Sequence, residues 1–455
     1  MTKPQHSACV RFAAASTALL FAVQSKVFAA ARTWTGATSN DASVAGNWNA
    51  LPVSGTDSLV FATTTDPLRR SPTFNTDFTA KGGNTLDFNS ATSDFTLGGT
   101  GVLTLDTAGA TATTIIRHLS STVNSQTIKN NVILTNSVSA SAAVNINLGA
   151  TANSLTFGGN VTSLAGELKL NGSNASSAIT FASLTSANAF TITTPSTVTI
   201  TNASGLTGTT TINGANVRLG SSLGSGGIIA LTGASDTVLR LANGMTLNNA
   251  IQSGSVLTNK TSLQVDSGTA TITGLISGSR PLEKTGVGTL VLSGVNHTYS
   301  GELTITQGRF QIDSGKFNNA IAVNLGAATL SALNAQTFGT LDVTGSAIID
   351  FTSSTTSFAF ADSSAVNWSG GILSISGGFF TNGSSLRFGT SSTGLTSAQL
   401  ALIRMTGFDT FNLDSSGYLV ATSSVPEPAT YSAVAGLAIL GFATSRRRRR
   451  AVVGQ

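Results

Sequence analysis

The chain has 455 residues, of which 9% are charged, 40% are hydrophobic and 48 are glycine. A disordered chain would be richer in charge and poorer in apolar residues, so the composition indicates a folded protein. The formal charge of +5 comes from the ends: removing Lys3, Arg11, Lys26 and Arg446 to Arg450 from the 24 basic residues leaves 16 against 19 acidic ones. The body is therefore slightly acidic, and no nucleic acid partner is expected.

Residues 1–31 have the features of a secretory signal peptide. Lys3 and Arg11 form a charged region, Phe12 to Val23 form an apolar region, and the small residues before Ala31 offer a cleavage site. A retained N-terminal anchor is the alternative, although the apolar run is short for one. The only cysteine, Cys9, lies in this leader, so the mature chain is expected to contain neither a disulfide nor thiol chemistry.

Residues 32–73 are predicted to cap the N-terminal end of a repeat array. They contain two of the three tryptophans, Trp34 and Trp48, followed by a short apolar segment that ends at Phe61. This opening resembles that of many secreted bacterial β-solenoids. Such stacks need an atypical terminal unit to cover the end of the core. We expect both tryptophans to be structural residues of the cap, with a sugar-stacking platform as the alternative.

Residues 74–422 show one pattern throughout. Short segments with alternating apolar and polar residues, many of them β-branched, are separated by Gly, Asn, Ser and Thr. This period of two predicts short strands. The predicted fold is all-β, a parallel β-helix (β-solenoid) of roughly 15 rungs of about 23 residues each. A pair of β-sandwich domains is the alternative, and one short helix is expected between Thr396 and Met405.

The clearest repeat unit covers residues 282–312. It contains a Thr-Gly-x-Gly-Thr-Leu-x-Leu-Ser-Gly core, followed by Tyr-Ser-Gly and Gly-Arg-Phe. The unit resembles the autotransporter-associated β-strand repeat. A partial copy over residues 206–219 aligns with it at a spacing of 93 residues, which places Ile212 opposite Ile305. We expect this spacing to correspond to four rungs.

Candidate catalytic residues are few. His297 is expected in an exposed turn, and His118 has no acid nearby in the sequence. The acids of the body are single and scattered, without an Asp-Asp or Asp-x-Asp pair. Polysaccharide-cleaving β-helices use clustered carboxylates, so we expect no enzyme, although acids from distant rungs could converge. Residues 98–103 lack the aspartate of a calcium-binding nonapeptide. No catalytic residue, metal site or cofactor is predicted.

Residues 423–455 form a tail of three parts: Pro426-Glu427-Pro428, an apolar segment over residues 429–444, and the arginine run 446–450. The prolines keep the tripeptide out of a helix interior. The apolar segment is predicted to be a single transmembrane helix of about 24 Å, slightly shorter than a bilayer core of about 30 Å. The arginines would hold its end on the cytoplasmic side.

This order of elements resembles the PEP-CTERM sorting tail of Gram-negative bacterial surface proteins. The resemblance implies recognition by an exosortase, a membrane peptidase, through a signal made of Pro426, Glu427, Pro428, Arg446, Arg447, Arg448, Arg449 and Arg450. It also implies transient residence in the inner membrane, then transfer to the cell surface or the extracellular matrix. An ordinary C-terminal anchor is the alternative.

The predicted function is that of an exported, non-enzymatic β-solenoid at the cell surface or in a biofilm matrix. Its weakly charged Thr-, Asn- and Ser-rich surface makes exopolysaccharide a candidate ligand. A polysaccharide lyase or hydrolase is one alternative, and it requires acids or bases clustered on one face. A structural spacer or self-assembling surface-layer protein is the other.

Overall fold

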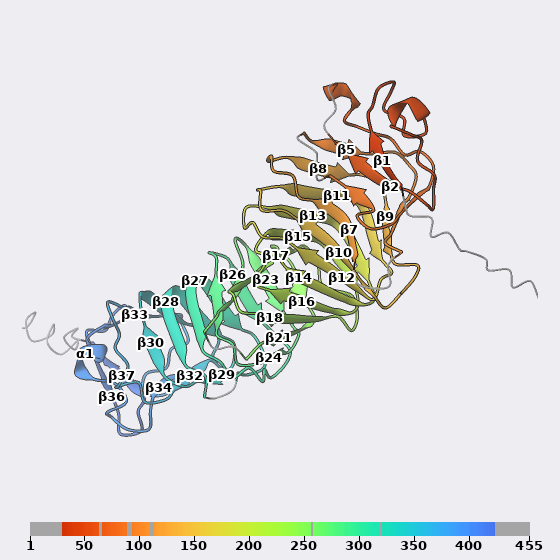
Figure 1. The fold of residues 1–455 in the computed structure, drawn as a ribbon. Helices are drawn as coiled ribbons and strands as arrows, with labels where there is room; N and C mark the ends of the chain where they lie inside the picture. Colours follow the sequence, from red (N-terminus) through yellow and green to blue (C-terminus); the bar gives the residue numbers. More distant parts are fainter. Residues whose placement is uncertain are drawn as a thin grey trace, which may run out of the picture.

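The computed structural model describes residues 30–62, 66–88, 93–108, 113–255, 258–317 and 320–423. Over these residues the chain forms an elongated stack of parallel strands with about 13 turns, from the cap at the N-terminal end to a hairpin at the C-terminal end (Figure 1). The predicted parallel β-solenoid is therefore confirmed. The sandwich alternative is wrong, and the predicted number of turns is slightly too large.

The first face of the stack is an 11-stranded parallel sheet. Its strands, in spatial order, are β1 (Ala31–Trp34), β2 (Ser58–Phe61), β4 (Leu86–Asp87), β7 (Thr113–His118), β10 (Ala143–Leu148), β12 (Glu167–Asn171), β14 (Ala189–Thr193), β16 (Thr209–Asn213), β18 (Ile228–Thr232), β21 (Ala250–Ser253) and β24 (Ile276–Ser277).

A second face runs along most of the stack. It contains β5 (Phe95–Leu97), β8 (Ser125–Ile128), β11 (Ser154–Ser163), β13 (Ala178–Ser186), β15 (Thr197–Leu206), β17 (Asn216–Leu219), β19 (Thr237–Leu241), β22 (Thr261–Gln264), β25 (Leu282–Thr285), β27 (Leu303–Ile312), β28 (Val323–Ala332) and β30 (Leu341–Val343). The longest of these strands turn a corner, so that their second halves belong to a third face. In β11, Leu155 pairs with Gln126 of β8, whereas Val161 pairs with Val132 on the third face.

The third face and the C-terminal end complete the stack. The third face adds β3 (Phe78–Lys81), β6 (Leu103–Asp106), β9 (Val132–Thr135), β20 (Thr246–Leu247), β23 (Thr269–Ile272), β26 (Thr289–Leu292), β31 (Ser346–Phe351), β33 (Ile372–Ser376) and β35 (Ile403–Arg404). The last turns contain the sheet β29 (Ala335–Thr337), β32 (Ser357–Phe360), β34 (Leu386–Phe388), the helix α1 (Ser397–Leu400) and the antiparallel hairpin β36 (Thr410–Leu413), β37 (Leu419–Thr422).

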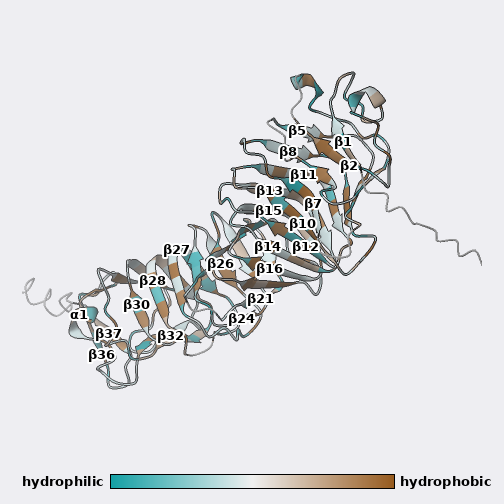
Figure 2. Cartoon of the chain, viewed as in Figure 1, coloured by the Kyte–Doolittle hydropathy of each residue, from teal (hydrophilic) through white to brown (hydrophobic). Residues whose placement is uncertain are grey.

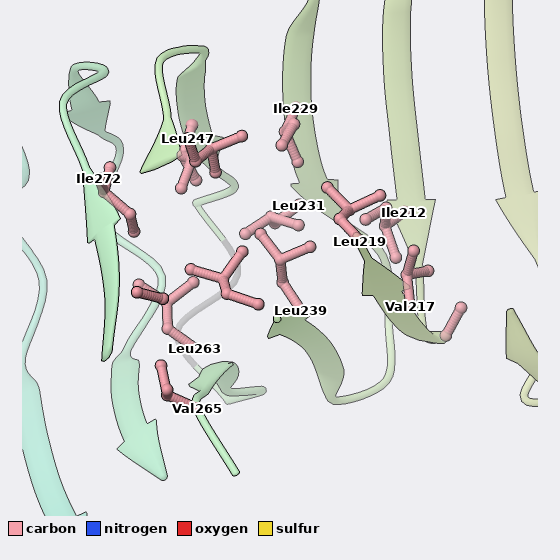
Figure 3. Close-up of a cluster of buried hydrophobic side chains, with 14 of the residues drawn as sticks. Ile212, Val217, Leu219, Ile229, Leu231, Leu239, Leu247, Leu263, Val265 and Ile272 are labelled. Carbon is pink, nitrogen blue, oxygen red and sulfur yellow. The ribbon is translucent and has the colours of Figure 1, made fainter. Parts of the chain in front are cut away.

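Alternation along each strand builds the core. In β12, Leu168 and Leu170 are fully buried, while Lys169 between them is partly exposed. Hydrophobic and hydrophilic segments accordingly alternate along the strands in Figure 2, and the apolar side chains of successive turns gather in one interior in Figure 3. Aromatic rings also stack between successive turns: the rings of Phe157 and Phe181 lie 4.8 Å apart between centroids, with planes only 2° apart.

The N-terminal cap covers the edge of the first strand. Trp34 and Trp48 pack edge to face at 5.0 Å between ring centroids, and Trp48 pairs antiparallel with Trp34. Both indoles are buried, and each donates its N–H to a backbone carbonyl, of Arg69 at 2.8 Å and of Ala42 at 2.9 Å, respectively. The two tryptophans are structural cap residues, as predicted. A covered edge cannot pair with another chain.

The length of the turns agrees with the prediction, but the predicted alignment of residues 93 positions apart does not hold. Ala143 pairs with Glu167, which pairs with Ala189, giving turns of 24 and 22 residues. The predicted equivalence of Ile212 and Ile305 is wrong, because Ile212 lies on β16 of the first face and Ile305 on β27 of the second. Turns of unequal length shift the register, so a constant sequence spacing does not join equivalent positions.

The predicted short helix is confirmed as the single turn α1. Thr396 and Gln399 form a reciprocal capping box that begins it. In the part of the chain that the structure describes, no helix is long and apolar enough to cross a bilayer. The transmembrane helix predicted over residues 429–444 lies outside the described residues, as does the signal peptide up to residue 29.

Candidate functional site

Five threonines form an outward ladder on the second face. They are register partners on consecutive turns: Thr96, Thr127, Thr156, Thr180 and Thr199. Each is partly exposed and is followed along its strand by a buried residue, so strand alternation directs its hydroxyl outward. The separation of neighbouring strands repeats these hydroxyls about every 4.8 Å along the stack. The described residues thus carry a regular row of outward hydroxyls on this face.

The hydroxyls of this threonine ladder are available to a ligand. Within the described residues, none of the five side chains makes an internal hydrogen bond. A parallel row two positions earlier, Ser125, Ser154, Ala178 and Thr197, adds small and mostly hydroxylated side chains beside them. The second face therefore presents uncharged donors and acceptors over several turns.

The polar ladder of the first face is satisfied internally. Asn171 donates to the Oδ1 atom of Asn147 at 3.0 Å, and Thr193 donates to Oδ1 of Asn171 at 2.7 Å. On the same strands, Glu167 contacts Lys169 at 3.1 Å and accepts a hydrogen bond from Thr191 at 2.5 Å. These side chains stabilise one turn against the next, and most of their hydrogen-bonding capacity is already used.

Two arginines extend the threonine ladder. Arg218 of β17 is the register partner of Thr199, and Arg240 of β19 is the register partner of Arg218. Arg240 Nη1 lies 3.9 Å from Asp266 Oδ2, a long contact between half-exposed groups. Arg218 is exposed and contacts no carboxylate within the described residues. The uncharged array thus ends in a pair of positive charges.

Several carboxylates near the strands are paired with cations. Asp87 bonds to Arg117, Asp57 contacts Arg32 at 2.7 Å, and Asp350 contacts Arg309 at 2.5 Å. Burial alone would raise the pKa of Asp57, but hydrogen bonds from Val53 and Arg32 and the charge of Arg32 lower it overall. No group of three or more His, Cys, Asp or Glu residues that could hold a metal occurs among the described residues.

One pair of acids differs from this pattern. Burial raises the pKa of the Asp342 carboxyl, and the nearby charge of Glu302 raises it further. Asn324 is the register partner of Asp342 and donates to Glu302 Oε1 at 2.6 Å, so it links the two acids. A carboxyl group with a raised pKa beside a second acid is a feature of acid–base sites.

The histidine prediction for the repeat is wrong. His297 is only 4% exposed, and its Nδ1 accepts a hydrogen bond from the N–H of Ile276 at 3.1 Å. The segment around it folds inward, because Tyr299 two residues later is fully buried and bonds to the carbonyl of Arg280 at 2.9 Å. Burial lowers the pKa of His297 to about 4, so the ring is neutral near pH 7.

A buried cation in the same repeat binds backbone carbonyls. The ammonium of Lys284 donates to the carbonyls of Thr285, Gly286 and Gln307 at 2.8, 2.7 and 3.1 Å. This role was not predicted from the sequence, although strand alternation places Lys284 on the same side as the inward Leu282. Gly286 has φ of +74°, and a Cβ there would lie 2.3 Å from the carbonyl oxygen of Val265, which explains a glycine at this corner.

A shallow pocket of about 310 Å³ lies where the N-terminal cap meets the first turns. Leu51, Phe74 and Phe78 form its apolar part, with Asp41 and Asp77 at its rim. Both acids already accept backbone hydrogen bonds, from Ser43 at 2.9 Å and from Val102 at 2.9 Å. These bonds give the two carboxylates a role in holding the cap loops.

The fold and its ladders define the class of protein: a capped parallel β-solenoid that displays polar ladders on its outer faces. Comparison with family models then finds two modules. Residues 282–312 match the passenger-associated-transport-repeat, and residues 424–449 match the PEP-CTERM protein-sorting motif. Both predicted resemblances are confirmed. No curated protein and no solved structure matches the chain.

The sorting motif implies an exported protein that is sorted by an exosortase. Together with the transport repeat, it suggests export to the surface of a Gram-negative cell. Pro426, Glu427, Pro428 and Arg446 to Arg449 lie within the matched segment, and Arg450 directly follows it. All of them lie outside the described residues. Their individual roles remain predictions.

Proposed function

We propose that this protein is a non-enzymatic, exported β-solenoid that binds exopolysaccharide at the cell surface or in the extracellular matrix. The threonine ladder carries this proposal, because its five hydroxyls are outward, in register and free of internal partners. Each hydroxyl can donate and accept, so the ladder matches the hydroxyl groups of a glycan chain.

Affinity would come from repetition. A single hydrogen bond exchanged with water contributes only about 0.5–1.5 kcal/mol. A polymer that lies along several turns makes many such bonds after the first contact, since later contacts are intramolecular. A rigid stack also loses little conformational freedom on binding, because its strands are already ordered.

The proposed route uses both ends of the precursor. The signal peptide over residues 1–31 would direct export, and the helix over residues 429–444 would hold the chain in the inner membrane until an exosortase acts near Pro426-Glu427-Pro428. The protein-sorting motif over residues 424–449 supports this order of events. The arginine run would then be absent from the mature protein, which would be slightly acidic.

The proposal of a non-enzymatic role is supported by the way the acids are used. Asp57, Asp87 and Asp350 bind arginines and so stabilise the stack. A carboxylate held in an ion pair is a poor general acid, because the partner's charge favours its ionised form.

A polysaccharide hydrolase is the second candidate, favoured by Asp342 and Glu302. The raised pKa of Asp342 is the direction a general acid requires. Release of reducing ends from a polymer by the purified protein, lost in both Asp342→Asn and Glu302→Gln variants, would establish it. Intact polymer after prolonged incubation would favour the binding role.

Self-assembly into a layer has less support. The cap covers the edge of β1, and the pairing of Arg387 with Tyr418 covers the edge of β34. Covered edges oppose end-to-end strand pairing. Sedimentation over a range of protein concentrations tests this, with ordered assembly at modest concentration as the outcome that would favour a layer.

The test of the main proposal is retention of the purified protein on immobilised polysaccharides. Neutral and acidic polymers should be compared, including matrix polymer from the producing cells. We expect retention that survives moderate salt, since the ladder is uncharged. Absence of retention on every polymer would overturn the proposal.

A further inference from the structure

Arg218 and Arg240 are direct register partners on neighbouring parallel strands. Their strands are separated by about 4.8 Å, and like charges directly opposite each other destabilise a sheet. Both side chains lie outward, because their neighbours Val217, Leu219 and Leu239 are buried. A destabilising pair in an otherwise consistent strand pattern indicates a functional constraint at this position.

The pair is not neutralised by the protein. Arg240 has one long contact, 3.9 Å to Asp266, and the other oxygen of Asp266 accepts from Gln264 at 2.5 Å. Arg218 contacts no carboxylate in the described part of the chain. The next acid, Asp236, accepts the backbone N–H of Lys260 at 2.8 Å.

Other arginines of the stack show what a structural role looks like. Arg32 and Arg309 each contact a carboxylate at 2.7 and 2.5 Å, and Arg117 bonds to Asp87. Arg280 is fully buried and binds four backbone carbonyls, those of Gly233, Ser235, Asn259 and Lys260. Arg218 has neither kind of partner, so its guanidinium is open to an anion.

We propose that Arg218 and Arg240 form an anion site that selects acidic polysaccharides, with the anionic group on a sugar unit at the end of the threonine ladder. The inference rests on the proposed function, because the ladder must bind the rest of the chain. A guanidinium is a planar fork that holds a carboxylate or sulfate through two parallel hydrogen bonds. Thr199, one strand away, is placed to bond to a hydroxyl of the neighbouring sugar.

The continuity of the ladder gives this site its selectivity. An extended polymer that follows Thr156, Thr180 and Thr199 continues directly onto Arg218. Neutral polymers would use only the hydroxyls and leave both charges solvated. Acidic polymers would gain a charge-assisted contact, which is roughly twice as strong as a neutral hydrogen bond.

The experiment compares the full-length wild-type protein with an Arg218→Gln/Arg240→Gln variant. Polygalacturonate, dextran sulfate and unsubstituted dextran serve as probes, in a titration at low and moderate salt. The variant should bind the acidic probe at least tenfold more weakly, lose its salt dependence and keep its affinity for dextran. A Lys316→Gln/Arg404→Gln variant removes two exposed charges outside the ladder and should behave as wild type.

The outcomes are distinguishable. A larger loss on polygalacturonate assigns the site to carboxylates, and a larger loss on dextran sulfate assigns it to sulfate esters. Unchanged acidic-polymer binding in the variant overturns the arginine site but leaves polysaccharide binding intact. No binding of any probe by the wild type overturns the proposed function itself.

A charge-preserving variant, Arg218→Lys/Arg240→Lys, covers the case in which the glutamine variant folds poorly. It should show an intermediate loss, since lysine keeps the charge but cannot form the two-bond contact. Circular dichroism of all variants should match the wild type. Wild-type affinity in the lysine variant overturns two-bond recognition as the basis of selectivity. Binding of duplex DNA in place of both acidic polysaccharides overturns the choice of polymer.

Discussion

The Nζ atom of Lys284 lies 3.1 Å from the carbonyl oxygen of Gln307 on the next turn, although Lys284 is almost completely buried. It also binds the carbonyls of Thr285 and Gly286 at the same corner. The ammonium thus satisfies three carbonyls that the corner would otherwise bury without partners. A cation in the core of a solenoid is here a connector between turns.

Replacing Lys284 by methionine should destabilise the protein. The three carbonyls would lose their donor, which destabilises the folded state. Removing the buried charge is favourable but smaller, so we expect the free energy of unfolding to fall by about 2 kcal/mol. Urea unfolding of wild type and variant at pH 7 measures this, with Lys129→Met as an exposed control. A variant as stable as wild type would show that water replaces the ammonium.

The same comparison has a defined pH dependence. Burial lowers the pKa of Lys284 to about 8 from an ordinary value of 10.5. The folded state therefore binds fewer protons than the unfolded state between these values, and stability gained from this group rises with pH across that window. The stability difference between wild type and Lys284→Met should shift in favour of wild type between pH 8 and 10.5.

Strand periodicity predicted the solenoid because one rule, alternate burial, governs every turn. The same rule places Lys284 inward, but the carbonyl cluster that it binds exists only after folding, so its role could not be predicted from the sequence. The predicted exposure of His297 was wrong for the same reason: its turn is buried together with Tyr299, whose contacts are made by neighbouring turns. The threonine ladder was also hidden, because unequal turn lengths scatter its members along the sequence.

The pH dependence of stability in acid should depend on His118. The imidazole is buried beside Phe88, at 6.0 Å between ring centroids, and burial lowers its pKa to about 4 from 6.5. The unfolded state therefore takes up the proton first, so stability is complete above pH 6.5 and falls as the pH drops towards 4. The loss is at most about 3 kcal/mol for this residue.

A His118→Leu variant tests this directly. Between pH 6.5 and 4 its free energy of unfolding should fall less steeply than that of wild type, while the two are similar at pH 7. His297 makes the same kind of contribution. The His118→Leu variant should therefore lose about half of the pH dependence that the two buried histidines cause. An unchanged slope would mean that His118 takes up its proton as readily in the folded state as in the unfolded state.

Removing the Trp48 side chain from the cap should destabilise the N-terminal turns more than the rest of the stack. Trp48→Ala removes the edge-to-face contact with Trp34 and the hydrogen bond to Ala42, and large aromatic truncations in a core cost about 3–5 kcal/mol. Each turn contacts mainly its neighbours, so the effect should decay along the stack. Hydrogen exchange should speed up in β1 and β2 and stay unchanged in β27 and β28.

The sorting signal can be tested without reference to the solenoid. Glu427→Gln removes the charge of the Pro-Glu-Pro tripeptide, so the precursor should accumulate in the membrane fraction, with at least tenfold less protein released. Immunoblotting of cell fractions measures this. Asp313→Asn, a change on the solenoid surface, should leave sorting intact, and normal release of the Glu427→Gln variant would show that the glutamate is not recognised.

The threonine ladder makes the sharpest functional prediction. A Thr156→Val/Thr180→Val/Thr199→Val variant removes three hydroxyls in register while keeping the β-branched shape that suits a strand. At about 0.5–1.5 kcal/mol for each hydrogen bond, polysaccharide affinity should fall at least tenfold. Thr104→Val/Thr271→Val/Thr329→Val places the same change on partly exposed strand positions of the third face and should bind as wild type. An equal loss in both variants would point to a general effect of removing exposed hydroxyls, and no loss in either would remove the ladder from the binding site.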